Sequence, residues 1–279
     1  MKDLGKRSLV AIFGIPLLLF VIYYGGIYFA ITLATISTIA LWEFYTMVAN
    51  KGAITEKKWG LMFNLIFWTL LYFSLNSINI SKLAIISVLF FLIGSLTIQL
   101  FSKNQNAIMN IATTWGGLIY VNLFFSSLFL IREFDSYFGN TLNFNPEFLV
   151  FSFILAIWIC DTSAYFIGSK FGKNKLLPAV SPKKSWEGAI AGFVGALFTM
   201  VIFNLATNNF NLIHSIFLGI IVGIAGQIGD LAESQLKRDA QVKDSSNILP
   251  GHGGFLDRFD SIMFVSPLIL IYLLILQLI

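Results

Sequence analysis

The chain has 279 residues, of which 57% are hydrophobic and only 11% are charged, and its mean hydropathy is +0.82. Average soluble domains carry roughly 25% charged residues, so a water-soluble fold of this composition could not cover its surface with polar groups. A single cysteine, Cys160, excludes an internal disulfide. The composition therefore predicts an integral membrane protein.

Apolar runs long enough to cross a bilayer, about 20 residues each, recur along the whole chain. They predict an all-α, polytopic fold with about nine transmembrane helices in a single membrane domain, residues 1–279. Within it, 1–131 are expected to be structural helices and 148–279 to hold the catalytic helices and loops. The expected spans are Leu9–Tyr24, Ile27–Val48, Trp59–Leu75, Leu83–Phe101, Ile111–Ile131, Phe148–Gly168, Ala189–Leu205, Leu212–Ile228 and Ser261–Leu278.

Gly25 and Gly26 alone separate the first two runs, which predicts a tight helical hairpin. No small-x-small cleavage site follows the first run, so we favour a membrane anchor over a signal peptide. The third run is the weakest prediction, because it is short and contains Asn64.

The basic residues are distributed unevenly between the loops. With the N-terminus in the cytoplasm and nine spans, every Lys and Arg except Lys82 and Arg132 falls on the cytoplasmic side. This asymmetry is the positive-inside pattern of membrane proteins. The net charge of +4 therefore reflects the orientation of the protein in the membrane and does not indicate binding to nucleic acid. We expect a multi-pass protein of the cell membrane whose polar loops, and with them the active site, face the cytoplasm.

A polar stretch continues directly from the eighth span. If the helix extends beyond the membrane, Asp230, Glu233, Ser234 and Lys237 lie at i, i+3, i+4 and i+7 on one face. The alternative is a solvated helix end with ordinary i,i+4 pairs. We favour a functional face, because an ionisable group directly after an apolar span is costly without a partner or a role.

Three glycines, Gly251, Gly253 and Gly254, surround His252 just before the last span. Such a segment lets the backbone approach a ligand and presents N–H groups to an anion. The alternative is a tight turn before a helix. Asp257 and Asp260 follow at i, i+3, where simple helix capping would also favour carboxylates.

Two further polar features come from earlier in the chain. Asp161 lies within a predicted span, where a lone carboxylate is a functional candidate. Ser181-Pro-Lys-Lys-Ser185 immediately precedes a predicted helix and offers hydroxyls, two cations and free N–H groups for a phosphate. For Lys170, Lys173 and Lys175 we prefer the alternative role of positive-inside anchors.

Clustered carboxylates beside basic and glycine-rich loops suit Mg²⁺ and a polyphosphate. Magnesium is usually held by one or two carboxylates together with substrate phosphates. Phosphoryl and nucleotidyl transfer depend mainly on positioning and charge neutralisation. No Walker A sequence is present, so a nucleotide would bind by other means.

The C-terminal signature resembles that of the phosphatidate cytidylyltransferases, also called CDP-diacylglycerol synthases. It runs Ser234-x-Leu-Lys-Arg238, four residues, Lys243-Asp244, four residues, then Leu249-Pro-x-His-Gly-Gly-x-x-Asp-Arg-x-Asp260. Asp161-x-x-Ala-Tyr165 and Ser181-Pro-Lys-Lys-Ser-x-Glu-Gly188 are similar to other recurrent segments of that family. The resemblance covers about the C-terminal half of the chain.

The resemblance implies an enzyme that joins CTP to phosphatidic acid in the membrane with Mg²⁺, giving CDP-diacylglycerol and pyrophosphate. It leaves a second cation open and makes a homodimer plausible. The expected metal ligands are Asp230 and Asp257, supported by Asp161 and Asp260.

The remaining expected roles concern phosphate groups. The expected contacts to the CTP phosphates are Ser181, Lys183, Lys184 and Ser185. The groups expected to steady the α-phosphate or the phosphatidate headgroup are Ser234, Lys237 and Arg258. The further expected substrate contacts in the signature are Arg238, Lys243, Asp244, His252, Gly253 and Gly254.

Two alternatives remain open at the level of sequence. A CTP-dependent lipid kinase would use a comparable site but transfer the γ-phosphate. A membrane transporter would place its polar groups near the bilayer midplane and often show internal repeats. The gathering of ionisable residues at helix ends, and no visible repeat, favour the transferase.

Overall fold

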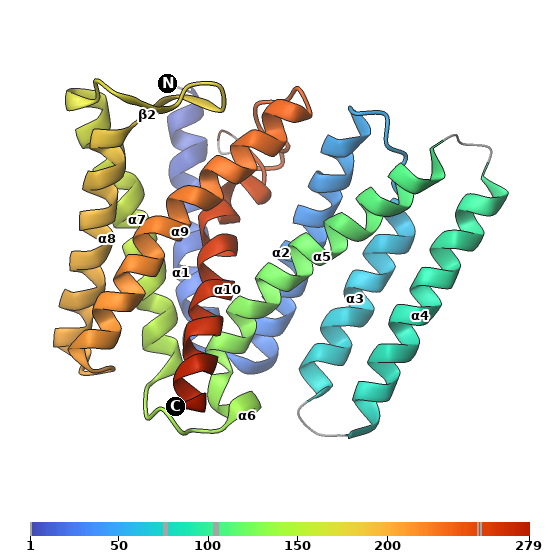
Figure 1. Cartoon of the computed structure of the whole chain (residues 1–279), viewed down its shortest axis with the longest axis horizontal. Helices are drawn as coiled ribbons and strands as arrows, with labels where there is room; N and C mark the ends of the chain where they lie inside the picture. The colour runs from blue at the N-terminus through green and yellow to red at the C-terminus, as the bar shows by residue number, and fades with distance from the viewer. Residues whose placement is uncertain (1, 75–77, 103–105, 250, 252) are drawn as a thin grey trace.

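The structure, a computed structural model, describes residues 2–74, 78–102, 106–249, 251 and 253–279. Helices dominate it (Figure 1). They are α1 (Lys2–Tyr24), α2 (Gly26–Ala49), α3 (Lys57–Phe73), α4 (Ile78–Phe101), α5 (Ala107–Arg132), α6 (Phe134–Phe138), α7 (Pro146–Phe171), α8 (Trp186–Thr207), α9 (Leu212–Asp239) and α10 (Leu256–Leu278).

The predicted polytopic membrane fold is confirmed. Within the described ranges, seven helices are long and apolar enough to cross a membrane: α2, α4, α5, α7, α8, α9 and α10. Helix α1 contributes a shorter apolar stretch, Ile12–Tyr24, and α3 has 17 residues. The count of nine spans therefore stays a prediction for these two helices.

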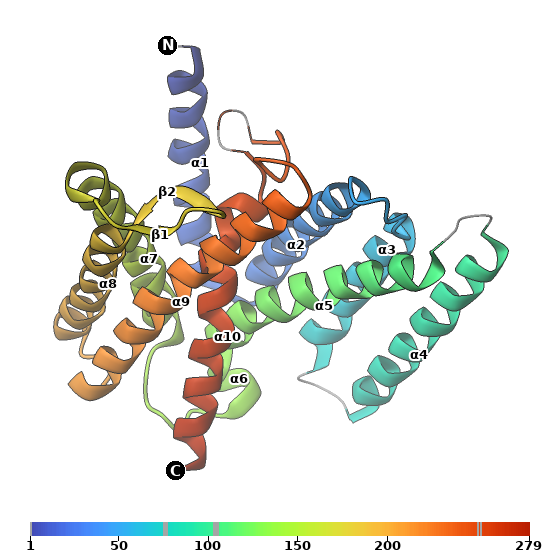
Figure 2. The same ribbon diagram turned by 45° about the horizontal axis from the view of Figure 1, so that its top comes forward.

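A short antiparallel hairpin departs from the helical pattern in the described part of the chain. Strands β1 (Lys175–Leu177) and β2 (Ser181–Ser185) pair Lys175 with Ser185 and Leu177 with Ser181. The hairpin lies at the end of the bundle where α7 ends and α8 begins (Figure 2). The segment expected as a loop is thus a strand, because pairing with β1 satisfies its backbone.

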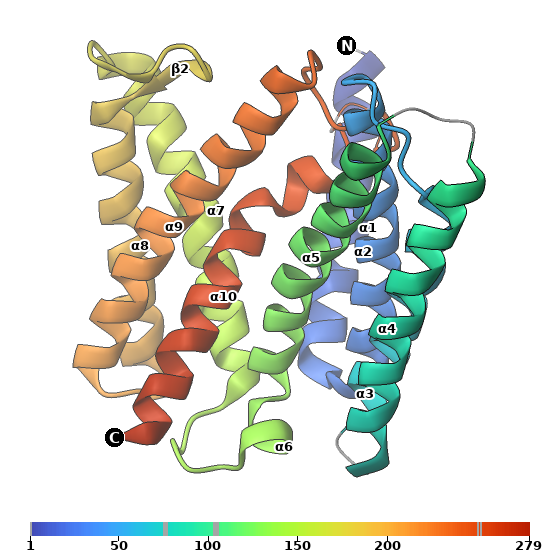
Figure 3. The ribbon, with the colours of Figure 1, turned by 45° about the vertical axis from the view of Figure 1, so that its right-hand side comes forward.

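The helices form two groups that meet where α5 packs against α10. Helices α7, α8, α9 and α10 pack together on one side, and α2, α3, α4 and α5 on the other (Figure 3). Contacts of α5 with both α2 and α10 join the groups. Phe29, Phe125 and Phe153 are among the side chains fully buried in the common core.

The polar residue in the weakly predicted third run has partners on a neighbouring helix. Asn64 is buried, and its Nδ2 donates to Thr38 Oγ1 at 2.7 Å on α2. Trp68 Nε1 of α3 donates to Ser37 Oγ of α2 at 2.7 Å. In an apolar environment such bonds satisfy groups that water cannot reach, so α3 is fastened to α2 by polar side chains.

The predicted hairpin between the first two helices is confirmed, and Arg132 closes it from outside. Helix α1 ends with carbonyls that have no partner within the helix. Arg132 Nε donates to Ile22 O at 2.5 Å, and its Nη2 donates to Tyr23 O at 2.7 Å. The neighbouring Glu133 Oε1 accepts from Gly26 N at 2.7 Å. Arg132, one of the two basic residues expected on the non-cytoplasmic side, thus caps the C-terminal end of α1.

We expect Arg132→Met to lower the thermal stability of the protein. The variant leaves two helix-end carbonyls without their charged donor, and bonds of this kind contribute about 1.5–3 kcal/mol each when charge-assisted. The midpoint of thermal unfolding of the detergent-solubilised protein, followed by scanning fluorimetry, measures the effect. Lys82→Met removes the same charge from the exposed start of α4 and is the matched control. Equal midpoints for the two variants would contradict the capping role.

Candidate functional site

The predicted site residues gather at one end of the bundle, where α7 and α9 end and α8 and α10 begin. Figure 1 shows the hairpin and the 240–255 connection at this same end, beside the N-terminus of α1. Segments far apart in the sequence therefore contribute to one polar region.

Helix α9 continues without a break to Asp239, as the sequence predicts. Its polar face holds two i,i+4 pairs. Ser234 Oγ donates to Asp230 Oδ1 at 3.3 Å, and Lys237 Nζ forms an ion pair with Glu233 Oε2. Glu233 is fully buried and Lys237 is 9% exposed. The ammonium of Lys237 therefore compensates a carboxylate that has no access to water.

The hairpin brings a lysine from the sequence-predicted phosphate segment onto this face. Lys184 Nζ lies 2.6 Å from Asp230 Oδ2, and both side chains are partly exposed. Ser185 is the N-cap of α8 and accepts from Gly188 N at 3.2 Å. Lys183 is exposed and Ser181 half-buried. The segment thus places two lysines beside a helix N-terminus, next to the acidic end of α9.

Three carboxylates from three helices act on one another here. Asp161 of α7 interacts electrostatically with Asp230, Lys184 and Arg258. Asp260 of α10 interacts with Asp230 and Asp161. Asp161 is exposed at the surface of the protein. Neighbouring carboxylates repel one another, and the Lys184 ammonium beside Asp230 offsets this repulsion.

A glycine sets the separation of two of these helices. A Cβ built on Gly229 would lie 2.8 Å from Asp260 O and 2.8 Å from Phe264 Cβ, closer than real Cβ contacts. Only glycine allows the backbones of α9 and α10 to meet there. Because Asp230 follows Gly229 directly, this contact brings Asp230 beside Asp260.

Asp257 has a different environment from the other three aspartates. Its Oδ1 accepts from Lys237 Nζ at 2.5 Å. Its Oδ2 accepts from Ser245 N and Ser245 Oγ, each at 2.9 Å, and from Gly254 N at 2.8 Å. The carboxylate is therefore engaged by protein donors on both oxygens. In this structure it closes the glycine-rich loop onto α9.

Asp161, Asp230 and Asp260 carry carboxylate oxygens, which are donors that magnesium prefers. Within the described ranges, no three His, Cys, Asp or Glu side chains meet in an arrangement that would hold a metal ion. Magnesium does not require such a cage, because one or two carboxylates and substrate phosphates suffice. Asp161, Asp230 and Asp260 offer oxygen donors of this kind, and they interact electrostatically with one another. The chemistry of these donors is therefore compatible with magnesium.

The rest of the signature surrounds this region. Arg238 Nη1 donates to Val242 O at 3.0 Å and so fixes the chain after α9. Lys243, Asp244 and Arg258 are exposed. Gly254 is buried, and His252 lies outside the described residues.

Sequence reasoning missed Glu43, a fully buried carboxylate on α2. Its oxygens accept four hydrogen bonds from the loop before α10 and the start of that helix: Ser245 Oγ at 3.1 Å, Ser246 Oγ at 2.5 Å, Phe255 N at 3.0 Å and Leu256 N at 2.8 Å. An ionisable residue inside an apolar run was the available signal. The N-terminal helices therefore position the site loop as well as supporting the bundle.

Tyr120 of α5 is a second contribution from the N-terminal half. Its hydroxyl is buried and interacts electrostatically with Glu233 and Asp260. The sequence gives no reason to single out this tyrosine among nine. Helix α5 thus contributes a side chain to the polar region.

Comparison with known proteins gives matches over nearly the whole chain. The model of the cytidylyltransferase family matches residues 5–276. A phosphatidate cytidylyltransferase of Bacillus subtilis (strain 168) is 35% identical over 274 residues, 96% of each chain. One of Staphylococcus aureus (strain COL) is 34% identical over 278 residues, 96% of this chain and 98% of the relative. One of Staphylococcus haemolyticus (strain JCSC1435) is 39% identical over 197 residues, 70% of each.

We expect Glu43→Gln to loosen the loop between α9 and α10. A neutral amide weakens charge-assisted bonds from four donors, each about 1.5–3 kcal/mol in a buried setting. Amide hydrogen exchange of residues 245–256, followed by mass spectrometry, should accelerate at least tenfold. Glu147→Gln, at the opposite end of α7, is the control. Unchanged protection of the loop would show that Glu43 does not hold it.

Proposed function

Because the chain belongs to the cytidylyltransferase family, we propose that it is a phosphatidate cytidylyltransferase, which transfers CMP from CTP to phosphatidate. The match to that family over residues 5–276 carries the proposal. The polar region described above supports it, since a lipid phosphate and a soluble nucleotide must meet at the ends of membrane helices. The products are CDP-diacylglycerol and pyrophosphate.

The reaction makes one bond and breaks one. A phosphate oxygen of phosphatidate attacks the α-phosphorus of CTP, and the bond from that phosphorus to the oxygen bridging to the β-phosphate breaks. Pyrophosphate leaves with the bonding electrons. The attacking oxygen is already ionised, so no general base is required. The protein's task is to hold two anions together and neutralise their charge.

The hairpin supplies cations for the triphosphate in this proposal. Lys183, Lys184, Ser181 and the N-terminus of α8 at Ser185 form a phosphate-binding edge. Lys184 Nζ lies against Asp230 in this structure. We propose that it exchanges this carboxylate for a CTP phosphate, which frees an oxygen of Asp230.

The freed Asp230, with Asp161 and Asp260, would hold Mg²⁺, which neutralises charge on the triphosphate when bound. Asp257 keeps its metal role as a sequence-based prediction, although its oxygens are engaged by Lys237, Ser245 and Gly254. Ser234 and Arg258 would face the α-phosphate or the phosphatidate headgroup. Lys237 acts through Asp257 and Glu233, by holding the loop in place.

The polar end of the bundle faces the cytoplasm in this proposal. The Lys and Arg excess in the loops at this end supports that orientation, and it places the site where CTP is available. A homodimer remains a proposal drawn from the family resemblance.

The product of the reaction distinguishes this proposal from a CTP-dependent lipid kinase. Purified protein is incubated with phosphatidate, Mg²⁺ and CTP labelled in the cytosine ring, and the lipids are extracted. We expect label in the organic phase, with pyrophosphate released in equal amount. Label that stays in the aqueous phase as CDP would contradict the proposal and favour phosphoryl transfer from the γ-position.

We expect Asp230→Asn to reduce kcat about 100-fold, the order of effect found when a metal-site residue is altered. Partial recovery at raised Mg²⁺ is expected, because the amide weakens metal binding without removing the other carboxylates. Asp239→Asn is the matched control on the same helix, since Asp239 is exposed and forms an ion pair with Lys51. Undiminished activity of Asp230→Asn, with normal membrane expression, would overturn the assignment.

A further inference from the structure

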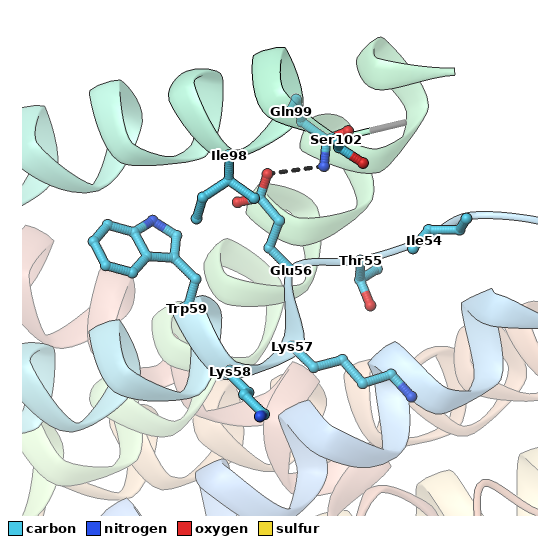
Figure 4. A pocket seen from close by; sticks show the side chains of 9 residues that line it. All are labelled: Ile54, Thr55, Glu56, Lys57, Lys58, Trp59, Ile98, Gln99 and Ser102. Atoms are coloured by element: carbon cyan, nitrogen blue, oxygen red, sulfur yellow. Dashed lines mark hydrogen bonds between the residues drawn. The ribbon is translucent and has the colours of Figure 1, made fainter. Parts of the chain in front are cut away.

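Two buried carboxylates of the N-terminal half differ in what they hold. Glu56, just before α3, is 8% exposed, and its Oε1 accepts from Gln99 Nε2 of α4 at 3.0 Å (Figure 4). Its backbone N–H donates to Thr114 Oγ1 of α5 at 3.0 Å. These bonds join N-terminal helices to one another. Glu43 is fully buried and instead accepts from the segment that leads into α10, so it links the two halves of the chain.

The segment before α10 is packed closely around two carboxylates. A Cβ built on Gly254 would lie 2.5 Å from Glu43 Oε1, and closer still to Ser245 Oγ, which is nearer than real Cβ contacts. Gly253 has a φ of +80°, and a Cβ there would lie 2.7 Å from Asp257 Oδ2. Carboxylates of the protein itself therefore account for two glycines of the signature.

Ser245 lies between these two carboxylates. Its Oγ is 3.1 Å from Glu43 Oε2 of α2 and 2.9 Å from Asp257 Oδ2 of α10, and the residue is 7% exposed. A hydroxyl group carries a single proton, so it donates to one carboxylate at a time or shares the bond between both. Among the residues that the structure describes, no other side chain forms hydrogen bonds with both carboxylates. Ser245 is therefore the direct link between α2 and the start of α10.

Asp257 carries this link on to α9. Its Oδ1 accepts from Lys237 Nζ at 2.5 Å, and Lys237 also forms an ion pair with Glu233. A continuous run of polar contacts thus joins α2, the loop, the first turn of α10 and α9. The same turn of α10 carries Arg258, and Asp260 follows directly after it. The orientation of this turn therefore sets where two residues of the candidate site lie.

We propose that Ser245 is a positioning residue of the transferase site, whose hydroxyl fixes the first turn of α10 relative to α2. Its effect on catalysis rests on the proposed function, in which Arg258 and Asp260 take part. Ser245 itself contacts no substrate and acts through Asp257. A displacement of about 1 Å can reduce the rate of an enzyme about 100-fold, so loss of the hydroxyl lowers kcat. The hairpin that holds the CTP phosphates in the proposed function does not contact Ser245, so KM for CTP is preserved.

Two neighbouring serines give a matched pair of variants. Ser245→Ala removes the hydroxyl that contacts both carboxylates. Ser246→Ala removes a hydroxyl that donates to Glu43 Oε1 at 2.5 Å and accepts from Ile248 N at 3.2 Å. A purely structural role would make Ser246→Ala at least as harmful as Ser245→Ala, because both take a donor from the same buried carboxylate. The positioning role predicts that Ser245→Ala alone impairs the reaction.

Two measurements are made at a temperature at which wild type and both variants are folded. In amide hydrogen exchange without nucleotide, residues 254–260 should exchange about tenfold faster in Ser245→Ala, the contribution of one hydrogen bond to a charged group. In steady-state assays of CDP-diacylglycerol formation, Ser245→Ala should lower kcat about tenfold for the same reason, with KM for CTP within about twofold of wild type. Ser246→Ala should stay within about twofold of wild type in both measurements.

Several outcomes would overturn the proposal. An equal or larger loss of kcat in Ser246→Ala, or no loss in either variant, would remove the special role of Ser245. Faster exchange with kcat retained would make Ser245 a purely structural residue. A raised KM for CTP with kcat retained would indicate a contact with the nucleotide instead.

The two measurements also separate this proposal from the proposed function. If wild type forms CDP-diacylglycerol and the two serine variants behave alike, the function stands and the role of Ser245 fails. If wild type forms none, while Ser245→Ala alone loosens residues 254–260, the function fails and the link through Ser245 stands.

Discussion

The polar end of the molecule depends on one buried carboxylate. Glu43 sits in the apolar interior of α2 and accepts from backbone and side chain of the segment that leads into α10. Without it, the first N–H groups of α10 and the hydroxyl of Ser246 would lose this acceptor. The glycine-rich loop, Asp257 and its contact with Lys237 all follow from where this segment is held. A helix of the N-terminal half thus orders the C-terminal signature.

Two kinds of acidic group lie side by side at this end. Glu43, Glu233 and Asp257 are paired within the protein and organise the loop and helix ends. Asp161, Asp230 and Asp260 share a field in which Lys184 supplies the nearby positive charge. The carboxylates of the first group are engaged by donors that hold the loop and the helix ends. The second group is the one that the proposed reaction would use.

Much of the fold could be predicted because lipid imposes simple rules on sequence. The apolar runs, the Gly25-Gly26 hairpin and the continuation of α9 through Lys237 all follow from length, turn residues and periodicity. The partnerships of Asp257 and Glu43 could not be predicted, because they depend on contacts between segments distant in the chain. The strand at Ser181–Ser185 was missed because its pairing partner, Lys175–Leu177, is too short to show a pattern. The aspartates were found because charge beside an apolar run is conspicuous, yet their division into two groups needed coordinates.

The contact at Gly229 has a consequence for how much the acidic site can adjust. Helices usually contact one another through side chains, and a change of side-chain rotamer allows the distance between the helices to vary slightly. At Gly229 the helix backbone lies directly against Asp260 O and Phe264 Cβ, so no side chain at this position can adjust the spacing of α9 and α10. If the proposed site takes a metal ion, adjustment to ions of different radius would have to come from the carboxylate rotamers, the hairpin and the loop.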